Sequence, residues 1–173
     1  ADLWRSLNAH RRTIDFGLDA PAEVRGRYTG HALHSEIVLQ TPAGEAAFRL
    51  DVPGVHNVRN ALAAAAVGYA LGLPQTQTAE GLAAFRGPKG RLQRVAGRNG
   101  AVLVDDTYNA NPESALAAVA VLSAMPGRRM LVLGDMGELG GETERGHARV
   151  GAAARAAGIE ALYTLGNASA AAA

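Results

Sequence analysis

The 173 residues allow one domain or two small ones, and an apolar content of 48% is enough for a real core and too high for a disordered segment. The 17 basic and 16 acidic residues are well mixed and leave a formal net charge of +1, which argues against a broad basic face that binds nucleic acid. The absence of cysteine excludes disulfides and thiolate metal sites, and no apolar run reaches the roughly 18 residues that a membrane-spanning helix needs.

Both ends of the sequence resemble cut ends. The first residues, Ala1-Asp2-Leu3-Trp4, contain no Met and no signal-peptide pattern, and the last, NASAAAA, resemble the beginning of a helix. We therefore expect an internal piece of a longer protein, in which functional residues outside the chain matter as much as those inside it.

The first half of the chain predicts short strands followed by helices. Residues 1–20 give no clear prediction, but partly alternating stretches follow, separated by turn signals such as Pro42-Ala43-Gly44, and these predict antiparallel strands. The predicted strands are 23–29, 33–40 and 45–51, and two helices follow at 57–71 and 76–85, the first stopped by Gly72 and Pro74.

Glycine, proline and cations cluster in RGPKGR at 86–91, which is the best candidate for a linker between two domains. Beyond it, strands alternate with helices, so we predict an α/β fold with a doubly wound parallel sheet from about residue 100 onward. Asn111 suits the N-cap of the next helix and Pro112 its first position. The predicted strands are 91–95, 101–105, 129–133 and 159–165, and the predicted helices are 112–124 and 143–157.

Polar side chains crowd the loop that follows a strand in VDDTYNANP, residues 104–112. In an open α/β sheet, ligands bind beyond the carboxyl ends of the strands, where carboxylates can accept hydrogen bonds from ribose hydroxyls or approach a magnesium ion. A helix cap explains Asn111 by itself. Asp106, Tyr108 and Asn109 together favour a functional loop, because one cap does not need four polar side chains.

A glycine-rich loop, LGDMGELGG, follows the next predicted strand and carries Asp135 at a similar position. Its glycine spacing is similar to the dinucleotide fingerprint G-x-G-x-x-G but does not match it. We interpret the segment as a flexible loop that needs positive φ and close approach of the backbone, rather than as a nicotinamide site.

Two asparagines open the first long helix, in GVHNVRNALAAAA. Asn57 and Asn60 are three residues apart and share one helical face, where their amides can both donate to and accept from a purine edge. One N-cap and one solvent-facing asparagine is the simpler alternative. His31, His34 and His147 lack metal-ligand spacing, so we expect surface or packing residues and no metal site in the chain.

Arg91, in GPKGRLQ, lies at the predicted junction between the domains. A hinge arginine can reach phosphoryl oxygens and donate to them bidentately, although an exposed linker cation is the usual alternative. The sequence contains no G-x-x-x-x-G-K-[ST], so a nucleotide bound here would lack its phosphate-binding loop.

Taken together, four stretches resemble the Mur ligase family: GVHNVRNALAAAAVGYALG, GPKGRLQ, VDDTYNANPESALAAVAVL and LVLGDMGELGGETERGH. DDTYNANP and LGDMGELG are the most discriminating, and they resemble the branch that adds D-alanyl-D-alanine to UDP-N-acetylmuramoyl-tripeptide. The resemblance implies a three-domain, monomeric, cytoplasmic enzyme of peptidoglycan precursor synthesis that uses ATP and Mg²⁺. Residues 1–88 would end its central P-loop ATPase-type domain, and residues 89–173 would form most of its Rossmann-like C-terminal domain.

The resemblance also implies roles for single residues. In the family, two asparagines lie near the adenine and a histidine precedes them in the same motif, a catalytic arginine reaches the terminal phosphate, and an aspartate contacts the ribose region. The polar loop after the strand helps to shape the site for the incoming amine. The matching residues are His56, Asn57, Asn60, Arg91 and Asp106 for the nucleotide and Tyr108, Asn109 and Asn111 for the substrate. The family's magnesium ligands and phosphate-binding lysine have no counterpart in this chain.

Two alternatives stay open. The first is another ligase of the same superfamily, adding diaminopimelate or lysine, or a folylpolyglutamate synthase. The second is a non-catalytic α/β module that holds a nucleotide or partner with residues 100–173. The linker at 86–91 and the asparagine helix before it argue against the second alternative, because a lone module needs neither.

Overall fold

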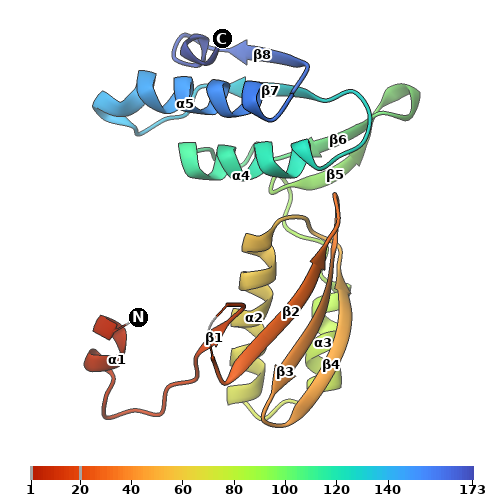
Figure 1. Ribbon diagram of the computed structural model, residues 1–173, viewed down its shortest axis with the longest axis vertical. Helices are drawn as coiled ribbons and strands as arrows, with labels where there is room; N and C mark the ends of the chain where they lie inside the picture. The colour runs from red at the N-terminus through yellow and green to blue at the C-terminus, as the bar shows by residue number, and fades with distance from the viewer. Residues whose placement is uncertain (1, 20) are drawn as a thin grey trace. The chain divides into compact units, whose positions relative to one another are not determined.

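The computed structural model describes residues 2–19 and 21–173 and divides them into two compact units (Figure 1). The first unit holds most of the chain up to Phe85. The second holds Arg86 and everything after it, together with His31–His34 and Asp51–Gly54. No helix in the described part of the chain is long and apolar enough to cross a membrane.

A four-stranded sheet forms the first unit, in the order β1-β2-β3-β4. β1 pairs parallel to β2, whereas β2, β3 and β4 form an antiparallel meander. Side chains alternate between the two faces, and the fully buried ones on the inner face include Val24, Ile37 and Leu39. The strands span Phe16–Gly17, Val24–Gly30, Ser35–Thr41 and Gly44–Leu50, so the three predicted strands are confirmed and β1 is added.

Two helices, α2 (Val55–Ala70) and α3 (Gln75–Ala84), cover the inner face of this sheet (Figure 1). Leu62 is fully buried in the cluster between α2 and the sheet, and burial of such a side chain stabilises the fold by roughly 1.5–3 kcal/mol. A Cβ on Gly26 would lie 2.8 Å from a methyl carbon of Leu62, so the missing side chain lets α2 approach β2. Gln75 fastens α3 to the sheet by donating from Nε2 to the Leu39 carbonyl oxygen at 3.0 Å.

The short helix α1 (Asp2–Leu7) precedes β1 in a region for which the sequence gives no prediction. Its apolar side chains Leu3, Trp4 and Leu7 are exposed. Arg5 pairs with Asp15 at 3.4 Å, and Arg12 pairs with Glu23 at 3.1 Å. The apolar side chains of α1 therefore contribute nothing to the core, whereas Ile14 and Leu18, further along, pack against it.

The second unit confirms the α/β prediction through β7 (Met130–Gly134), α5 (Thr143–Ala156) and β8 (Ala161–Leu165), in which the two strands pair in parallel. β5 (Gln93–Ala96) and β6 (Val102–Asp105) form a separate antiparallel pair, so among the described residues the parallel sheet does not continue from β6 to β7. The remaining elements are α4 (Pro112–Ser123) and three short 3₁₀ turns, η1 (Arg98–Gly100), η2 (Gly140–Glu142) and η3 (Ser169–Ala172).

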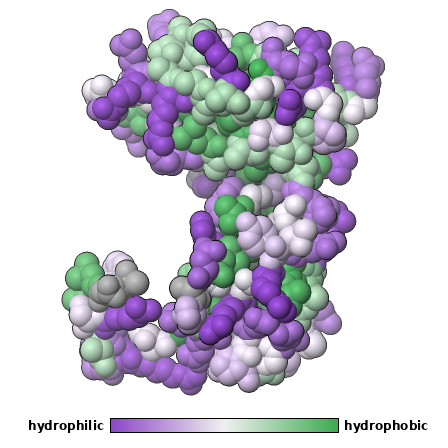
Figure 2. All heavy atoms as spheres, viewed as in Figure 1, coloured by the Kyte–Doolittle hydropathy of each residue, from purple (hydrophilic) through white to green (hydrophobic). Residues whose placement is uncertain are grey.

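The core of the second unit joins these elements around Val119, Leu133, Met136 and Val150. Gly151 on α5 is buried, and a Cβ there would stand 1.8 Å from the Ala172 carbonyl oxygen, so only glycine lets η3 pack this closely. Over the face in view, Figure 2 shows hydrophilic and hydrophobic residues interspersed, as the mixed composition leads one to expect.

Candidate functional site

Three of the predicted site residues lie close together where the strand β5 begins and the strand β6 ends: Arg91, Asp106 and Tyr108. The pair β5–β6 is antiparallel with Gln93 opposite Asp105, so the residues before β5 lie opposite those after β6. The Leu92 N–H donates to Asp106 Oδ1 at 3.0 Å, and the Tyr108 N–H donates to the Gly90 carbonyl oxygen at 3.0 Å. The linker and the polar loop are therefore joined on both sides of Arg91.

Arg91 extends its guanidinium over the ring of Tyr108, with 4.3 Å between the guanidinium carbon and the ring centroid. Both side chains are exposed, and such a cation–π contact is worth roughly 0.5–1 kcal/mol at an exposed site. The ring holds one face of the guanidinium and leaves the N–H groups at its edge available to an anion. The arrangement therefore presents an oriented cation rather than a free linker side chain.

Gly90 makes this arrangement sterically possible. Its φ is +72°, it is buried, and a Cβ on it would lie 3.2 Å from the Tyr108 nitrogen. Leu92 also has a positive φ, 49°, which a leucine adopts only where the surroundings impose it. The glycine-rich linker is thus folded tightly against the loop, with Arg91 between the two constrained positions.

The other polar residues of the loop have local structural roles as well. Asp105 Oδ1 accepts from the Thr107 N–H at 3.1 Å and from its hydroxyl at 2.7 Å. Asn111 caps α4 as predicted: its side chain accepts from the Ser114 N–H at 2.9 Å, and the Ser114 hydroxyl accepts from the Asn111 N–H. Asn109 is exposed. Asp105 and Asn111 therefore stabilise a turn and a helix cap, whereas Tyr108 and Asn109 are exposed on the surface.

Asp135 directly follows β7 and is exposed, and its carboxylate is bonded to a turn of the same unit. Its Oδ1 accepts from the Ser169 N–H at 2.7 Å, and backbone N–H groups of this turn, that of Ser169 first, lower the pKa of Asp135. A Cβ on Gly166, where φ is +117°, would stand 2.3 Å from the carboxylate. The carboxylate therefore closes the turn between β8 and η3, while its availability to a ribose or to magnesium stays a prediction, since the residue is exposed.

Replacing Asp135 with Asn should make the stability of the chain less sensitive to acid. The folded pKa lies below the unfolded value of about 3.9, so the contribution of Asp135 to stability is present above that value and is lost as pH falls through the folded pKa. Urea unfolding at neutral pH and down to about pH 3 checks this. We expect the variant to be less stable at neutral pH and to converge on the parent chain in acid, whereas parallel curves would contradict the assignment.

A fully buried histidine fixes the glycine-rich loop after β7. His147 on α5 has no exposed surface, and its Nε2 lies 2.9 Å from the Met136 nitrogen, whose N–H donates to it. Nε2 therefore carries no proton, and Nδ1–H donates to the Thr143 carbonyl oxygen at 2.7 Å. The sequence identified His147 only as a surface or packing residue, since a lone histidine gives no sign of its partner.

The residues predicted near the adenine lie in the first turns of α2, in the first unit. His56 and Asn57 are half-buried, and Asn60 is exposed one turn further on. Gly54, with φ +91°, turns the chain into the helix. The three-residue spacing of the two asparagines on one helix is as predicted.

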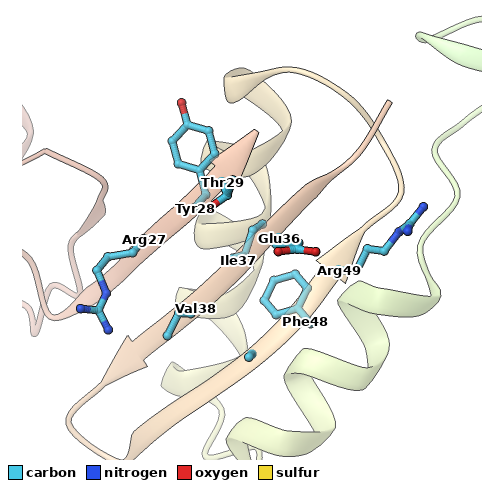
Figure 3. A pocket seen from close by; sticks show the side chains of 9 residues that line it. Arg27, Tyr28, Thr29, Glu36, Ile37, Val38, Phe48 and Arg49 are labelled. Carbon is cyan, nitrogen blue, oxygen red and sulfur yellow. The ribbon is translucent and has the colours of Figure 1, made fainter. Parts of the chain in front are cut away.

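The open face of the first unit carries a hollow of about 440 Å³ that contains none of the predicted site residues. Figure 3 shows Arg27, Glu36 and Arg49 among its side chains, on β2, β3 and β4. The sequence predicted no function for these strands.

Comparison with known proteins identifies the class. The description "Mur ligase middle domain" matches residues 3–68, and "Mur ligase, glutamate ligase domain" matches residues 90–173. The chain belongs to the Mur ligase family, as the sequence motifs predicted.

Among its curated relatives is UDP-N-acetylmuramoyl-tripeptide–D-alanyl-D-alanine ligase of Escherichia coli K12, 41% identical over 96% of this chain and 37% of the relative. The enzyme of the same name from Synechocystis is 40% identical over 90% of this chain and 32% of the relative. A crystal structure of MurF from Acinetobacter baumannii superimposes with a TM-score of 0.90 at 32% identity, over 99% of this chain and 37% of that one. The chain thus spans about a third of the length of these relatives.

Proposed function

We propose that the full-length protein joins D-alanyl-D-alanine to UDP-N-acetylmuramoyl-tripeptide with ATP, and that this chain supplies part of the enzyme. Two observations support the proposal: relatives of that name at 40–41% identity over 90–96% of the chain, and the oriented Arg91 beside the polar loop. We place the boundary between the end of the central domain and the C-terminal domain at residues 88 and 89. A cytoplasmic location and a monomeric state belong to the same proposal.

In the proposed reaction, an oxygen of the tripeptide carboxylate attacks the γ-phosphorus of ATP, and ADP leaves. The amine of D-alanyl-D-alanine then attacks the carbonyl carbon of the acyl phosphate, loses a proton, and displaces inorganic phosphate through a tetrahedral intermediate. Arg91 would donate to the phosphoryl oxygens on which negative charge develops, which stabilises the transition state more than the bound substrates. Tyr108 would keep the guanidinium in place.

Other residues of the chain would bind rather than react. His56, Asn57 and Asn60 would hold the adenine, and Asp106 would accept from the ribose with the acceptor capacity that its bond to Leu92 leaves free. Tyr108, Asn109 and Asn111 would border the site for the incoming amine. The cap of α4 uses only the side-chain oxygen of Asn111, so its side-chain nitrogen would be the atom that donates to the substrate.

The carboxylates that follow β6 and β7 already accept hydrogen bonds from their own surroundings. Asp105 and Asp135 each accept two or more hydrogen bonds within their own turns, and one oxygen of Asp106 is bonded to the Leu92 N–H. Mg²⁺ is usually held by one or two carboxylates together with waters and substrate phosphates, and the resemblance to the family implies that its magnesium ligands lie in the region this chain lacks. We therefore assign the magnesium ligands to parts of the protein outside this chain and derive no step through the ion.

The choice of amine tests the proposal. Full-length protein and ATP are incubated with D-alanyl-D-alanine and UDP-N-acetylmuramoyl-tripeptide, with meso-diaminopimelate or L-lysine and UDP-N-acetylmuramoyl-L-alanyl-D-glutamate, or with L-alanine and UDP-N-acetylmuramate, and ADP and ligated product are measured. We expect product with D-alanyl-D-alanine alone. L-alanine is included because a UDP-N-acetylmuramate–L-alanine ligase of Streptomyces coelicolor is 37% identical over 76% of this chain. Product with one of the other amines would assign the protein to a sister ligase, and no nucleotide turnover with any of them would favour a non-catalytic module.

A further inference from the structure

Two histidines face each other at the turn that joins β2 to β3. The ladder between these strands ends at the pair Gly30 and Ser35, and the next residues continue it, since the His31 N–H donates to the His34 carbonyl oxygen at 2.9 Å. The two imidazole rings are stacked, with centroids 4.3 Å apart and planes 12° from parallel. The sequence analysis expected only surface or packing residues here; a hairpin turn converts the spacing H-x-x-H into a pair of facing rings.

Glu36 adds a carboxylate to the same face of this hairpin. It lies two residues after His34, on β3, which begins at Ser35. A ring nitrogen of each histidine and a carboxylate oxygen of Glu36 all lie within 4.8 Å of one another. His31 and Glu36 are exposed and His34 is half-buried, so an ion can reach the group from solvent.

Two imidazole nitrogens and one carboxylate oxygen are a donor set typical of zinc and related divalent transition metals. With bonds of about 2.0–2.2 Å, the ligand atoms of a tetrahedral zinc ion stand about 3.3 Å apart. Rotation of exposed side chains about their χ angles can supply the small closure that is needed. Magnesium and calcium prefer all-oxygen shells and are poor candidates.

We propose that His31, His34 and Glu36 bind one divalent transition metal ion at the tip of the β2–β3 hairpin, leaving a fourth position for water. The site shares no residue with those to which the ligase reaction is assigned, and it does not depend on that assignment. Arg49 lies opposite Glu36 in the β3–β4 register, and its positive charge disfavours a cation near that carboxylate, so the histidines should carry most of the affinity.

Isothermal titration of the 173-residue chain, without an affinity tag, with Zn²⁺ alone tests the proposal. We expect saturable one-to-one binding, no comparable binding of Mg²⁺, and a rise in the melting temperature with Zn²⁺. His31→Asn and His34→Asn should each weaken binding by at least about tenfold, and Glu36→Gln should weaken it less. His10→Asn is the matched control, because His10 is an exposed histidine outside the group, and its variant should bind like the parent chain.

Circular dichroism and the melting temperature without metal establish that each variant is folded. The stacked pair would be only a packing contact of the turn if Zn²⁺ binding were absent or unsaturable. The proposal would also be overturned if His10→Asn weakened binding as much as His31→Asn, or if the three substitutions in the hairpin left binding unchanged.

Discussion

Replacing Arg91 with alanine in the full-length protein should lower the turnover number by about 10²–10³-fold, which corresponds to about 2.7–4 kcal/mol of lost transition-state stabilisation. The KM values for ATP and for the tripeptide should change much less, because the arginine is proposed to meet charge that develops only during phosphoryl transfer. Steady-state kinetics of the parent and the variant measure this difference. An unchanged turnover number would refute the role.

Tyr108 provides the matched controls for this experiment. Tyr108→Phe keeps the ring beneath the guanidinium and should stay close to the parent in turnover, whereas Tyr108→Ala removes the ring and should reduce turnover by a smaller factor than Arg91→Ala. Combining Tyr108→Ala with Arg91→Ala should add little, since the ring is proposed to act through the arginine. If Tyr108→Ala lowered turnover by the same factor in the Arg91→Ala background as in the parent, the tyrosine would act independently of the arginine.

Replacing His147 with alanine should destabilise the second unit by about 2–5 kcal/mol. The substitution leaves the Met136 N–H without its acceptor and opens a cavity at a position with no exposed surface. Urea unfolding followed by far-UV circular dichroism measures the loss. Hydrogen exchange at the Met136 amide locates it, since the single tryptophan, Trp4, lies in the first unit and does not report on the second.

Two further variants distinguish the contribution of the His147 hydrogen bonds to stability from that of its side-chain volume. His147→Gln can place a carbonyl oxygen near the position of Nε2 and should recover part of the stability, whereas the control His10→Ala, at an exposed position, should change stability by no more than about 0.5 kcal/mol. Exchange at Met136 that stays as slow in His147→Ala as in the parent chain would show that the histidine does not hold the loop.

The secondary structure was readable from the sequence where local chemistry determines it. Asn111 and Pro112 mark the start of α4 because cap and first-turn preferences are local, and Gly72 and Pro74 mark the end of α2 for the same reason. Residues 1–20 carry no periodic pattern, and the helix and strand there were not predicted. The continuation of a parallel sheet from β6 was expected from strand–helix alternation, which does not specify which strands pair.

The side-chain partners within the candidate site were not readable in this way. Arg91 and Tyr108 were each singled out, but their contact follows from the antiparallel register of β5 and β6, which places residues 17 positions apart side by side. The bond from Leu92 to Asp106 and that from Met136 to His147 likewise join segments that one sequence does not link. The histidine pair at the β2–β3 turn was missed because the spacing was considered without the hairpin that brings its members together.

The most direct test of the central claim is a crystal structure of the full-length protein with a non-hydrolysable ATP analogue and UDP-N-acetylmuramoyl-tripeptide. The distance to measure joins the Arg91 guanidinium nitrogens and the oxygens of the terminal phosphate. We expect a separation of about 2.7–3.2 Å, with the ring of Tyr108 still against the guanidinium. An Arg91 directed to solvent, with a different cation on the terminal phosphate, would contradict the proposed role of this linker.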